Sequence, residues 1–306
     1  MKDNTENCFV CEGITKKYKD TEVLHGINLC LERGKIYGLI GRNGAGKTTL
    51  LSILSAQNPA TSGNILLDGE PVWENENALS KICFSREINP TSQTGVGGLT
   101  VKEYLQTANM YFPKWDKQMA DELVKEFELD IKKKIMKLSK GMLSMLTIIL
   151  AMASKAEFTM LDEPVAGLDV FTREKFYQMV LEEYEKTGRT FVISTHIIDE
   201  ASPIFEEVIV IKKGDILLKE NTEELLARSF HITGKEEEVD LATKGLKQLH
   251  VKTLGRRKEV TVLLEDGQQI DTGADVTVSS VSLQNAFVAL CGDEPKEEGK
   301  DRVFYE

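Results

Sequence analysis

The chain has 306 residues, of which 41% are hydrophobic and 28% charged, an ordinary soluble balance with room for one large and one small domain or for two medium ones. Its 38 basic and 49 acidic side chains give a net charge of −11, which argues against a nucleic-acid partner because phosphate neutralisation needs a basic face. No apolar run reaches the roughly 20 residues of a membrane-spanning helix, and the first residues lack a signal-peptide core. We therefore expect a cytoplasmic protein that reaches a membrane only through a partner.

The first two-thirds of the chain alternate between strand and helix patterns. Before the first helix, strands are predicted at 8–11, 23–31 and 36–40. A helix follows at 47–54, a short strand and turn at 63–73, and helices within 100–129. Farther along we expect an apolar helix from near Leu143, strands at 158–162, 191–195 and 208–211, and an amphipathic helix from Phe171 to Lys186, closed by Gly188. This alternation predicts an α/β fold with a largely parallel central sheet.

The pattern changes after about residue 220. Charged stretches appear, with strand-like segments at 258–264 and 275–278 and a helix at 282–290. We expect a main domain over 8–220 and a small accessory α+β region over 221–306, with a frayed acidic tail from Glu294.

The segment from Gly41 to Thr48 fits the phosphate-loop pattern G-x-x-x-x-G-K-[ST], with a strand before it and a helix after it. Its glycines let backbone N–H groups turn inward on a phosphate chain, and the helix adds its positive dipole end. Lys47 is placed to reach the β- and γ-phosphates and Thr48 to bind Mg²⁺. The candidate nucleotide-binding residues here are Gly41, Arg42, Asn43, Gly44, Ala45, Gly46, Lys47, Thr48 and Thr49.

Two acids, Asp162 and Glu163, end the apolar strand at 158–162. An Asp in this position holds Mg²⁺ through water, and a Glu just beyond it accepts a proton from attacking water. Two acids after an apolar run are also common by chance, so this pattern alone does not define a site.

Three further signals are ambiguous when taken singly. Ser139 and Gly141 stand at a helix start, which suits either an anion site or a plain N-cap. The segment from Ala166 to Asp169 reads as a turn before a helix. His196 follows a strand and suits either donation to a γ-phosphate or a structural role.

Together, the order and spacing of these motifs over residues 8–220 resemble the nucleotide-binding cassette of ABC transporters. Gly41–Thr48 matches the Walker A loop, and Leu138–Met142 matches the LSGGQ signature. Phe158–Glu163 matches the Walker B strand with its catalytic Glu. Ala166–Asp169 matches the D-loop, and His196 matches the switch histidine. Tyr18 matches the aromatic residue that stacks on adenine, with an ordinary strand-end aromatic as the alternative.

The resemblance implies a P-loop NTPase core with an antiparallel β subdomain and a helical subdomain over about 88–156. It implies ATP and Mg²⁺ as cofactors, with catalytic roles for Glu163, His196 and Lys47 and metal-binding roles for Thr48, Asp162 and Glu87. It further implies a second cassette, in a homodimer or a heterodimer, whose signature (Ser139 and Gly141 in a second copy of this chain) lies on the bound ATP. A separate transmembrane permease is the other implied partner.

The chain departs from the family pattern at two motifs. Glu87 stands where the family usually has Gln; a carboxylate still ligates Mg²⁺, but it donates no hydrogen bond when ionised. The signature reads LSKGM, so that Lys140 and Met142 replace Gly and Gln. Lys140 either adds positive charge near the partner's nucleotide or faces solvent.

At a finer level, the segment from Tyr111 to Asp116, the LSKGM signature and the segment from Val281 to Leu290 resemble exporter-type cassettes of Gram-positive bacteria found in antibiotic-response operons. The favoured function is therefore the ATPase motor of an exporter. A soluble cassette ATPase acting on ribosomes or DNA is the alternative, and a small-molecule kinase is a more distant one. The transported substrate is not indicated, because selectivity belongs to the membrane subunit.

Overall fold

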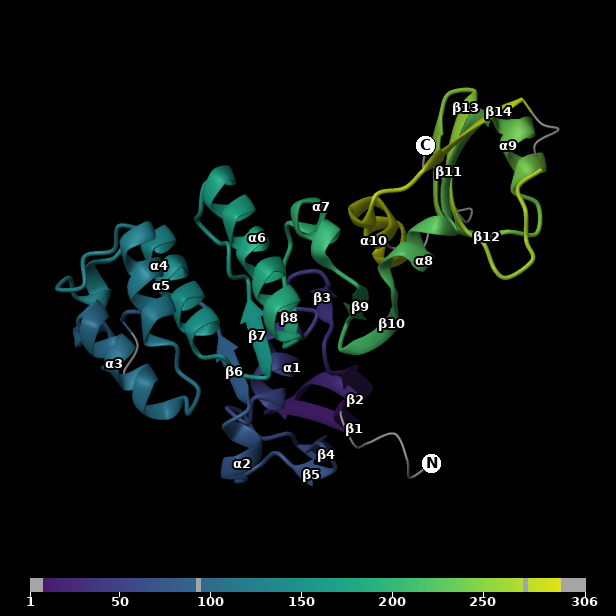
Figure 1. The fold of residues 1–306 in the computed structure, drawn as a ribbon. Coiled ribbons are helices and arrows are strands. Elements are labelled where there is room, and N and C mark those ends of the chain that lie inside the picture. Colours follow the sequence, from purple (N-terminus) through teal and green to yellow (C-terminus); the bar gives the residue numbers. More distant parts are fainter. Residues whose placement is uncertain (1–7, 92–94, 272–274, 293–306) are drawn as a thin grey trace, which may run out of the picture. The chain divides into compact units, whose positions relative to one another are not determined.

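A computed structural model describes residues 8–91, 95–271 and 275–292. The chain divides into two compact units, Met1–Glu220 and Asn221–Glu306 (Figure 1). Among the residues described, every helix is too short or too polar to cross a lipid bilayer.

A six-stranded sheet forms the centre of the first unit, in the order β10-β9-β3-β8-β7-β6. From β9 to β6 all neighbouring strands run parallel. The strands are β3 (Ile36–Ile40), β6 (Ile82–Ser85), β7 (Phe158–Asp162), β8 (Thr190–Ser194), β9 (Glu207–Lys212) and β10 (Asp215–Asn221). β3, β7 and β8 are buried along their whole length, which explains why they read as continuous apolar runs.

A second, four-stranded sheet in the order β2-β1-β4-β5 lies beside the first (Figure 1). Its strands are β1 (Cys8–Tyr18), β2 (Thr21–Glu32), β4 (Ser62–Leu67) and β5 (Glu70–Pro71), and neighbours in it pair antiparallel. Helix α1 (Lys47–Leu54) belongs to the same buried cluster as β1, β2, β3 and β7. Burial of its four apolar residues therefore joins both sheets at the point where the phosphate loop begins.

The remaining helices of the first unit have clear start and stop signals. They are α2 (Glu76–Leu79), α3 (Val101–Tyr111), α4 (Lys117–Glu126), α5 (Lys140–Ala153), α6 (Val170–Thr187) and α7 (Ile198–Ala201). Thr100 and Glu103 form a capping box at the start of α3. Ser139 and Asp169 cap α5 and α6, and Gly188 ends α6 with φ 63°. In Figure 1, α3, α4 and α5 gather to one side of the central sheet.

The second unit contains a four-stranded antiparallel sheet in the order β12-β13-β11-β14. Its elements are α8 (Thr222–Ala227), β11 (Ser229–Lys235), α9 (Glu236–Ala242), β12 (Lys247–Leu254), β13 (Arg257–Leu263), β14 (Val276–Ser280) and α10 (Leu283–Cys291). A small core of Ile232, Val239, Val260 and Val262 fixes α9 against the sheet.

The α/β class and the mixed core predicted from the sequence are confirmed. The expected limits of α1, β3 and β7 coincide with the observed ones. The sequence analysis did not predict β11, α9 or β12. For α9 the reason is that its first turn lies in the charged run 235–238. The acidic tail expected from Glu294 lies outside the described residues.

Gly38 in β3 is enclosed by the ring of Phe205, since a Cβ atom there would lie 2.5 Å from Phe205 Cε2. We predict that Gly38→Ala lowers the free energy of unfolding by about 1–3 kcal/mol, because the added methyl overpacks a buried strand. Urea unfolding followed by circular dichroism checks this. Gly98→Ala is the control, because a Cβ there meets no atom within 4 Å; equal effects of the two substitutions would contradict the prediction.

Candidate nucleotide site

The loop from Gly41 to Gly46 joins β3 to α1, and its glycines are required by geometry. A Cβ at Gly41 would lie 2.6 Å from the Ile211 carbonyl oxygen, and Gly46 has φ 111° at the N-cap of α1. Ala45 fastens the loop, since its N–H donates to Arg42 O at 3.0 Å and its carbonyl accepts from Gly214 N at 3.0 Å. The loop is therefore held in a turn that leads directly into a helix N-terminus.

Lys47 folds back over this loop. Its side chain is buried, and its Nζ donates to the carbonyl oxygen of Gly41 at 2.7 Å. An ammonium group so placed is a point charge at the mouth of the turn, where a phosphate oxygen can replace the carbonyl as its partner.

The carboxylate of Asp162, at the end of β7, accepts two side-chain hydrogen bonds. Its Oδ2 accepts from Thr48 Oγ1 at 2.6 Å and its Oδ1 from Ser194 Oγ at 2.7 Å. Asp162 and Ser194 are paired across the parallel strands β7 and β8. One carboxylate thus ties the first turn of α1 to two central strands, and the sequence reading missed Ser194. Its place at the end of a buried strand, two residues before His196, was the available signal.

The donor set at this point fits Mg²⁺. The ion prefers oxygen ligands and is usually held by one or two carboxylates together with phosphate and water oxygens. Thr48 and Asp162 supply a hydroxyl and a carboxylate within hydrogen-bonding distance of each other. Within the described part of the chain, no cluster of three or more His, Cys, Asp or Glu is placed to hold a metal ion.

Glu163 is held in an unusual backbone conformation next to His196. Its φ is 50°, and its N–H donates to Ser194 O at 2.9 Å. His196 donates its backbone N–H to Glu163 Oε2 at 3.3 Å, and its Nδ1 lies 2.5 Å from the same oxygen. A left-handed non-glycine residue costs of order 1–3 kcal/mol, so the surrounding hydrogen bonds must hold it there. Glu163 and His196, each predicted to be catalytic, are thus in contact, and Glu163 directly follows Asp162 in the chain.

Ser139 and Gly141 lie at the start of α5, where Ser139 Oγ accepts from Met142 N at 3.3 Å. A Cβ at Gly141 would lie 2.8 Å from Gly167 O, and Ser144 Oγ donates to Ala166 O at 2.6 Å. The helix start and the turn from Ala166 to Asp169 are therefore packed together within one chain. Of the described residues, neither Ser139 nor Gly141 lines the cavity that contains Thr48 and Asp162.

That cavity has a volume of about 760 Å³ and also contains Glu87, in the loop after β6. The carboxylate of Glu87 forms an ion pair with Lys140, with 3.4 Å between Oε1 and Nζ. The structure thus places Glu87 near the two metal-site candidates and at the same time gives it a basic neighbour that the sequence reading did not anticipate.

Tyr18 lies at the end of β1 with its ring partly exposed. Lys16 Nζ lies 4.9 Å from the ring centroid, and Asn58 Nδ2 donates to the hydroxyl at 2.5 Å. The cation and the hydrogen bond fix the ring plane. Adenine stacking on Tyr18 stays a prediction.

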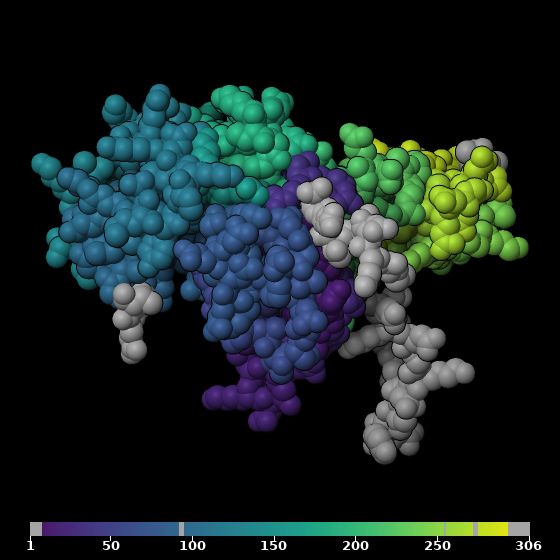
Figure 2. All heavy atoms as spheres, turned by 60° about the horizontal axis from the view of Figure 1, so that its bottom comes forward, coloured from purple at the N-terminus to yellow at the C-terminus, as the bar shows by residue number. Residues whose placement is uncertain are grey.

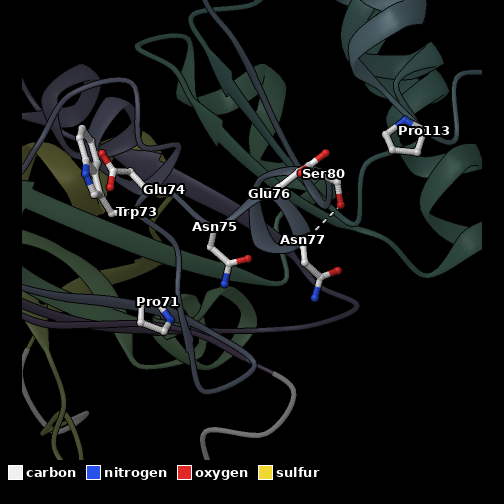
Figure 3. Close-up of a pocket in the computed structure, with 8 residues that line it drawn as sticks. All are labelled: Pro71, Trp73, Glu74, Asn75, Glu76, Asn77, Ser80 and Pro113. Atoms are coloured by element: carbon white, nitrogen blue, oxygen red, sulfur yellow. Dashed lines mark hydrogen bonds between the residues drawn. The ribbon is translucent and has the colours of Figure 1, made fainter.

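A groove runs along α2 and α3 on the first unit, and we call it the α2–α3 groove. It consists of two adjoining cavities of about 790 and 820 Å³ that share Glu74, Glu76, Ser80 and Pro113. Figure 3 shows Trp73 and Glu74 at one end of the first cavity and Pro113 at the other. In Figure 2 the blue surface of residues 62–90 and the teal-blue helical lobe lie side by side. Among the described lining residues there is no Lys or Arg.

Sequence comparison connects this site with known proteins. The ABC transporter family model matches residues 24–166. The ABC transporter ATP-binding protein YcbN of Bacillus subtilis is 30% identical over 215 residues, which are 70% of this chain and 69% of YcbN. YtrB of the same organism, also an ABC transporter ATP-binding protein, is 30% identical over 187 residues, 61% of this chain and 63% of YtrB.

The human ATP-binding cassette sub-family A member 13 is 31% identical over 210 residues, 66% of this chain but 4% of that protein. The chain thus spans less than two-thirds of YtrB and only a small part of this long human relative.

Solved structures agree on the fold. CbiO1 of Clostridium perfringens, described as part of the transporter complex cbiONQ, is 27% identical with a TM-score of 0.57, over 72% of this chain and 91% of that one. The ATP-binding subunit of an ABC transporter matches with a TM-score of 0.62 at 22% identity, over 72% of this chain and 92% of that one. The dimeric cassette MJ0796 matches with a TM-score of 0.61 at 23% identity, over 70% and 98%.

Proposed function

Because this chain belongs to the ABC transporter family as one of its ATPase subunits, we propose that it is the ATP-driven motor of an exporter and acts on a separate membrane permease from the cytoplasmic side. The observation that carries the ATP-driven part of the proposal is the position of Asp162. It joins Thr48 of the phosphate loop to Ser194, while Lys47 lies over the loop and Glu163 and His196 follow directly.

In the proposed site, the backbone N–H groups of residues 41–48 and the ammonium of Lys47 bind the phosphate chain of ATP. Tyr18 contacts the adenine ring. Thr48 and Asp162 hold Mg²⁺, which neutralises phosphate charge when it is bound. Charge-assisted contacts of this kind contribute about 1.5–3 kcal/mol each, so several suffice for firm nucleotide binding.

Glu163 is proposed as the base that accepts a proton from the attacking water. Its φ is 50°, and its Oε2 accepts a hydrogen bond from the backbone N–H of His196. His196 is exposed beside it, so its ring can turn to donate to the γ-phosphate as charge develops there. Lys47 stabilises the same charge from the other side.

A second cassette completes the site in this proposal. Ser139 and the first N–H groups of α5 form a helix start suited to an anion, and neither Ser139 nor Gly141 lines the cavity of their own chain. In an opposed copy they would meet the γ-phosphate bound by the first. Hydrolysis removes that phosphate, so closure of the pair and its release follow the state of the nucleotide.

The α2–α3 groove is the proposed permease contact. Met110 and Tyr111 at its edge are 85% and 77% exposed, an unusual state for large apolar side chains beside a cavity. Glu74 and Glu76 give it negative charge. Cytoplasmic segments of membrane proteins carry an excess of Lys and Arg, so an amphipathic basic segment of the permease complements both features.

Glu163→Gln is predicted to leave ATP binding intact and to lower the turnover number by about 10²–10⁴-fold, the usual range for loss of a general base. Phosphate release and ATP titration calorimetry measure the two effects. Glu174→Gln on the exposed side of α6 is the matched control. Near-normal turnover of Glu163→Gln would remove Glu163 from this role.

Lys47→Ala is predicted to weaken ATP binding by about 10- to 100-fold, since it removes a charged hydrogen bond to phosphate. Calorimetry of ATP binding checks this, with Lys102→Ala on the exposed face of α3 as control. An unchanged dissociation constant would count against the phosphate-loop assignment.

Tyr111→Lys is predicted to break the permease contact, because it replaces an exposed apolar side chain with a positive charge that repels a basic segment. The tagged chain is purified from detergent-solubilised membranes of its host, and co-purified proteins are identified by mass spectrometry. We expect a polytopic membrane protein with the unmodified chain and with the control Val288→Lys in α10, and none with Tyr111→Lys. Recovery of ribosomes or DNA instead would contradict the transport role.

A further inference from the structure

Two of the three positions at which the chain departs from the usual cassette pattern are in contact. Glu87 replaces a Gln and Lys140 replaces a Gly, and their charged atoms are 3.4 Å apart. Glu87 belongs to the loop after β6, whereas Lys140 is the first residue of α5. The contact therefore links two motifs that are far apart in the sequence.

Besides its contact with Lys140, Glu87 also lies near the candidate metal-binding residues. It lines the same cavity as Thr48 and Asp162, the oxygen donors that fit Mg²⁺, and Arg86 is the basic residue that lines the cavity beside it. A carboxylate in this place attracts a divalent cation, but a neighbouring ammonium weakens that attraction. Lys140 thus opposes the pull of the metal site on Glu87.

The stem of Lys140 is fixed by packing. A Cβ at Gly167 would lie 3.0 Å from Lys140 Cγ, and Gly167 itself has φ 78°. Gly141 and Ser144 hold the same turn against α5. With its stem packed against the turn from Ala166 to Asp169, Lys140 loses less freedom in reaching Glu87 than a free surface lysine would.

We propose that the pair of Glu87 and Lys140 is a latch, in which Lys140 acts as a positioning residue that lowers the affinity of the site for Mg²⁺–ATP until Glu87 turns to the nucleotide. Release of Glu87 leaves the Lys140 ammonium beside Ser139, facing the nucleotide of a second cassette. The inference rests on the proposed ATPase function and assigns to the two departures one joint role.

The test is a double-mutant cycle on ATP binding with and without Mg²⁺. The affinity gain is the dissociation constant of ATP in EDTA divided by that in excess Mg²⁺, measured by calorimetry at concentrations where light scattering shows a monomer. Lys140→Ala should raise this gain about two- to fivefold, the range expected for a partly exposed pair. In a Glu87→Gln background, Lys140→Ala should have no effect.

Two controls separate a latch from a structural role. Lys137→Ala removes an exposed lysine three residues earlier and should leave the gain unchanged. Lys140→Arg should restore the wild-type gain. The melting temperature of the nucleotide-free chain should be the same for Lys140→Ala and Lys137→Ala, because both charges of the pair are more than half exposed.

An unchanged or lowered gain in Lys140→Ala, or the same change in the Glu87→Gln background, would overturn the latch. A wild-type chain that binds no ATP would instead refute the proposed function.

Discussion

The first unit depends on one constraint: the groups that we propose to bind phosphate must meet at a single edge of a parallel sheet. Parallel strands bring their carboxyl ends to the same edge. β3 leads there into the phosphate loop, β7 ends at Asp162 and β8 at Ser194. The hydrogen bonds of Asp162 to Thr48 and Ser194 close this edge into one unit. The continuous burial of these strands makes it rigid enough for a charged ligand.

The sequence predicted this edge well because its signals are local. A phosphate loop needs glycines at fixed positions, and a buried parallel strand reads as an apolar run, so the expected bounds of β3, α1 and β7 agree with the structure. Asp162 and Glu163 follow such a run and lie where it ends. The resemblance implied catalytic roles for Glu163 and His196, and the structure adds their direct contact and the hydrogen bond from Glu163 N–H to Ser194 O.

Contacts between residues that are far apart in the sequence could not be predicted in this way. No local pattern indicates that Lys140 reaches Glu87, because the contact joins a loop after one strand to the start of a distant helix. In the second unit, α9 begins with the acidic run at 236–238, and Val239 and Ala242 are its buried residues. Two buried positions give too weak an apolar periodicity to predict this helix from the sequence.

The packing of α5 against the turn from Ala166 to Asp169 provides a physical link between Glu163 and the proposed surface for a second cassette. Gly141 lies against Gly167, and Ser144 holds Ala166. The same turn begins three residues after Glu163 and ends at the cap of α6. The turn therefore connects Glu163 to the start of α5, both along the chain and through packing contacts. The start of α5 is the surface that a second copy would present to ATP.

The most direct measurement of the central claim is the mass of the Glu163→Gln chain in solution with and without ATP and Mg²⁺. Sedimentation should show the 34.2 kDa monomer without nucleotide and a species of twice that mass with it. The same chain carrying Ser139→Arg should stay monomeric, because the bulky cation blocks the helix start that would face the γ-phosphate. A monomer under every condition, although ATP is bound, would contradict a nucleotide site shared between two copies.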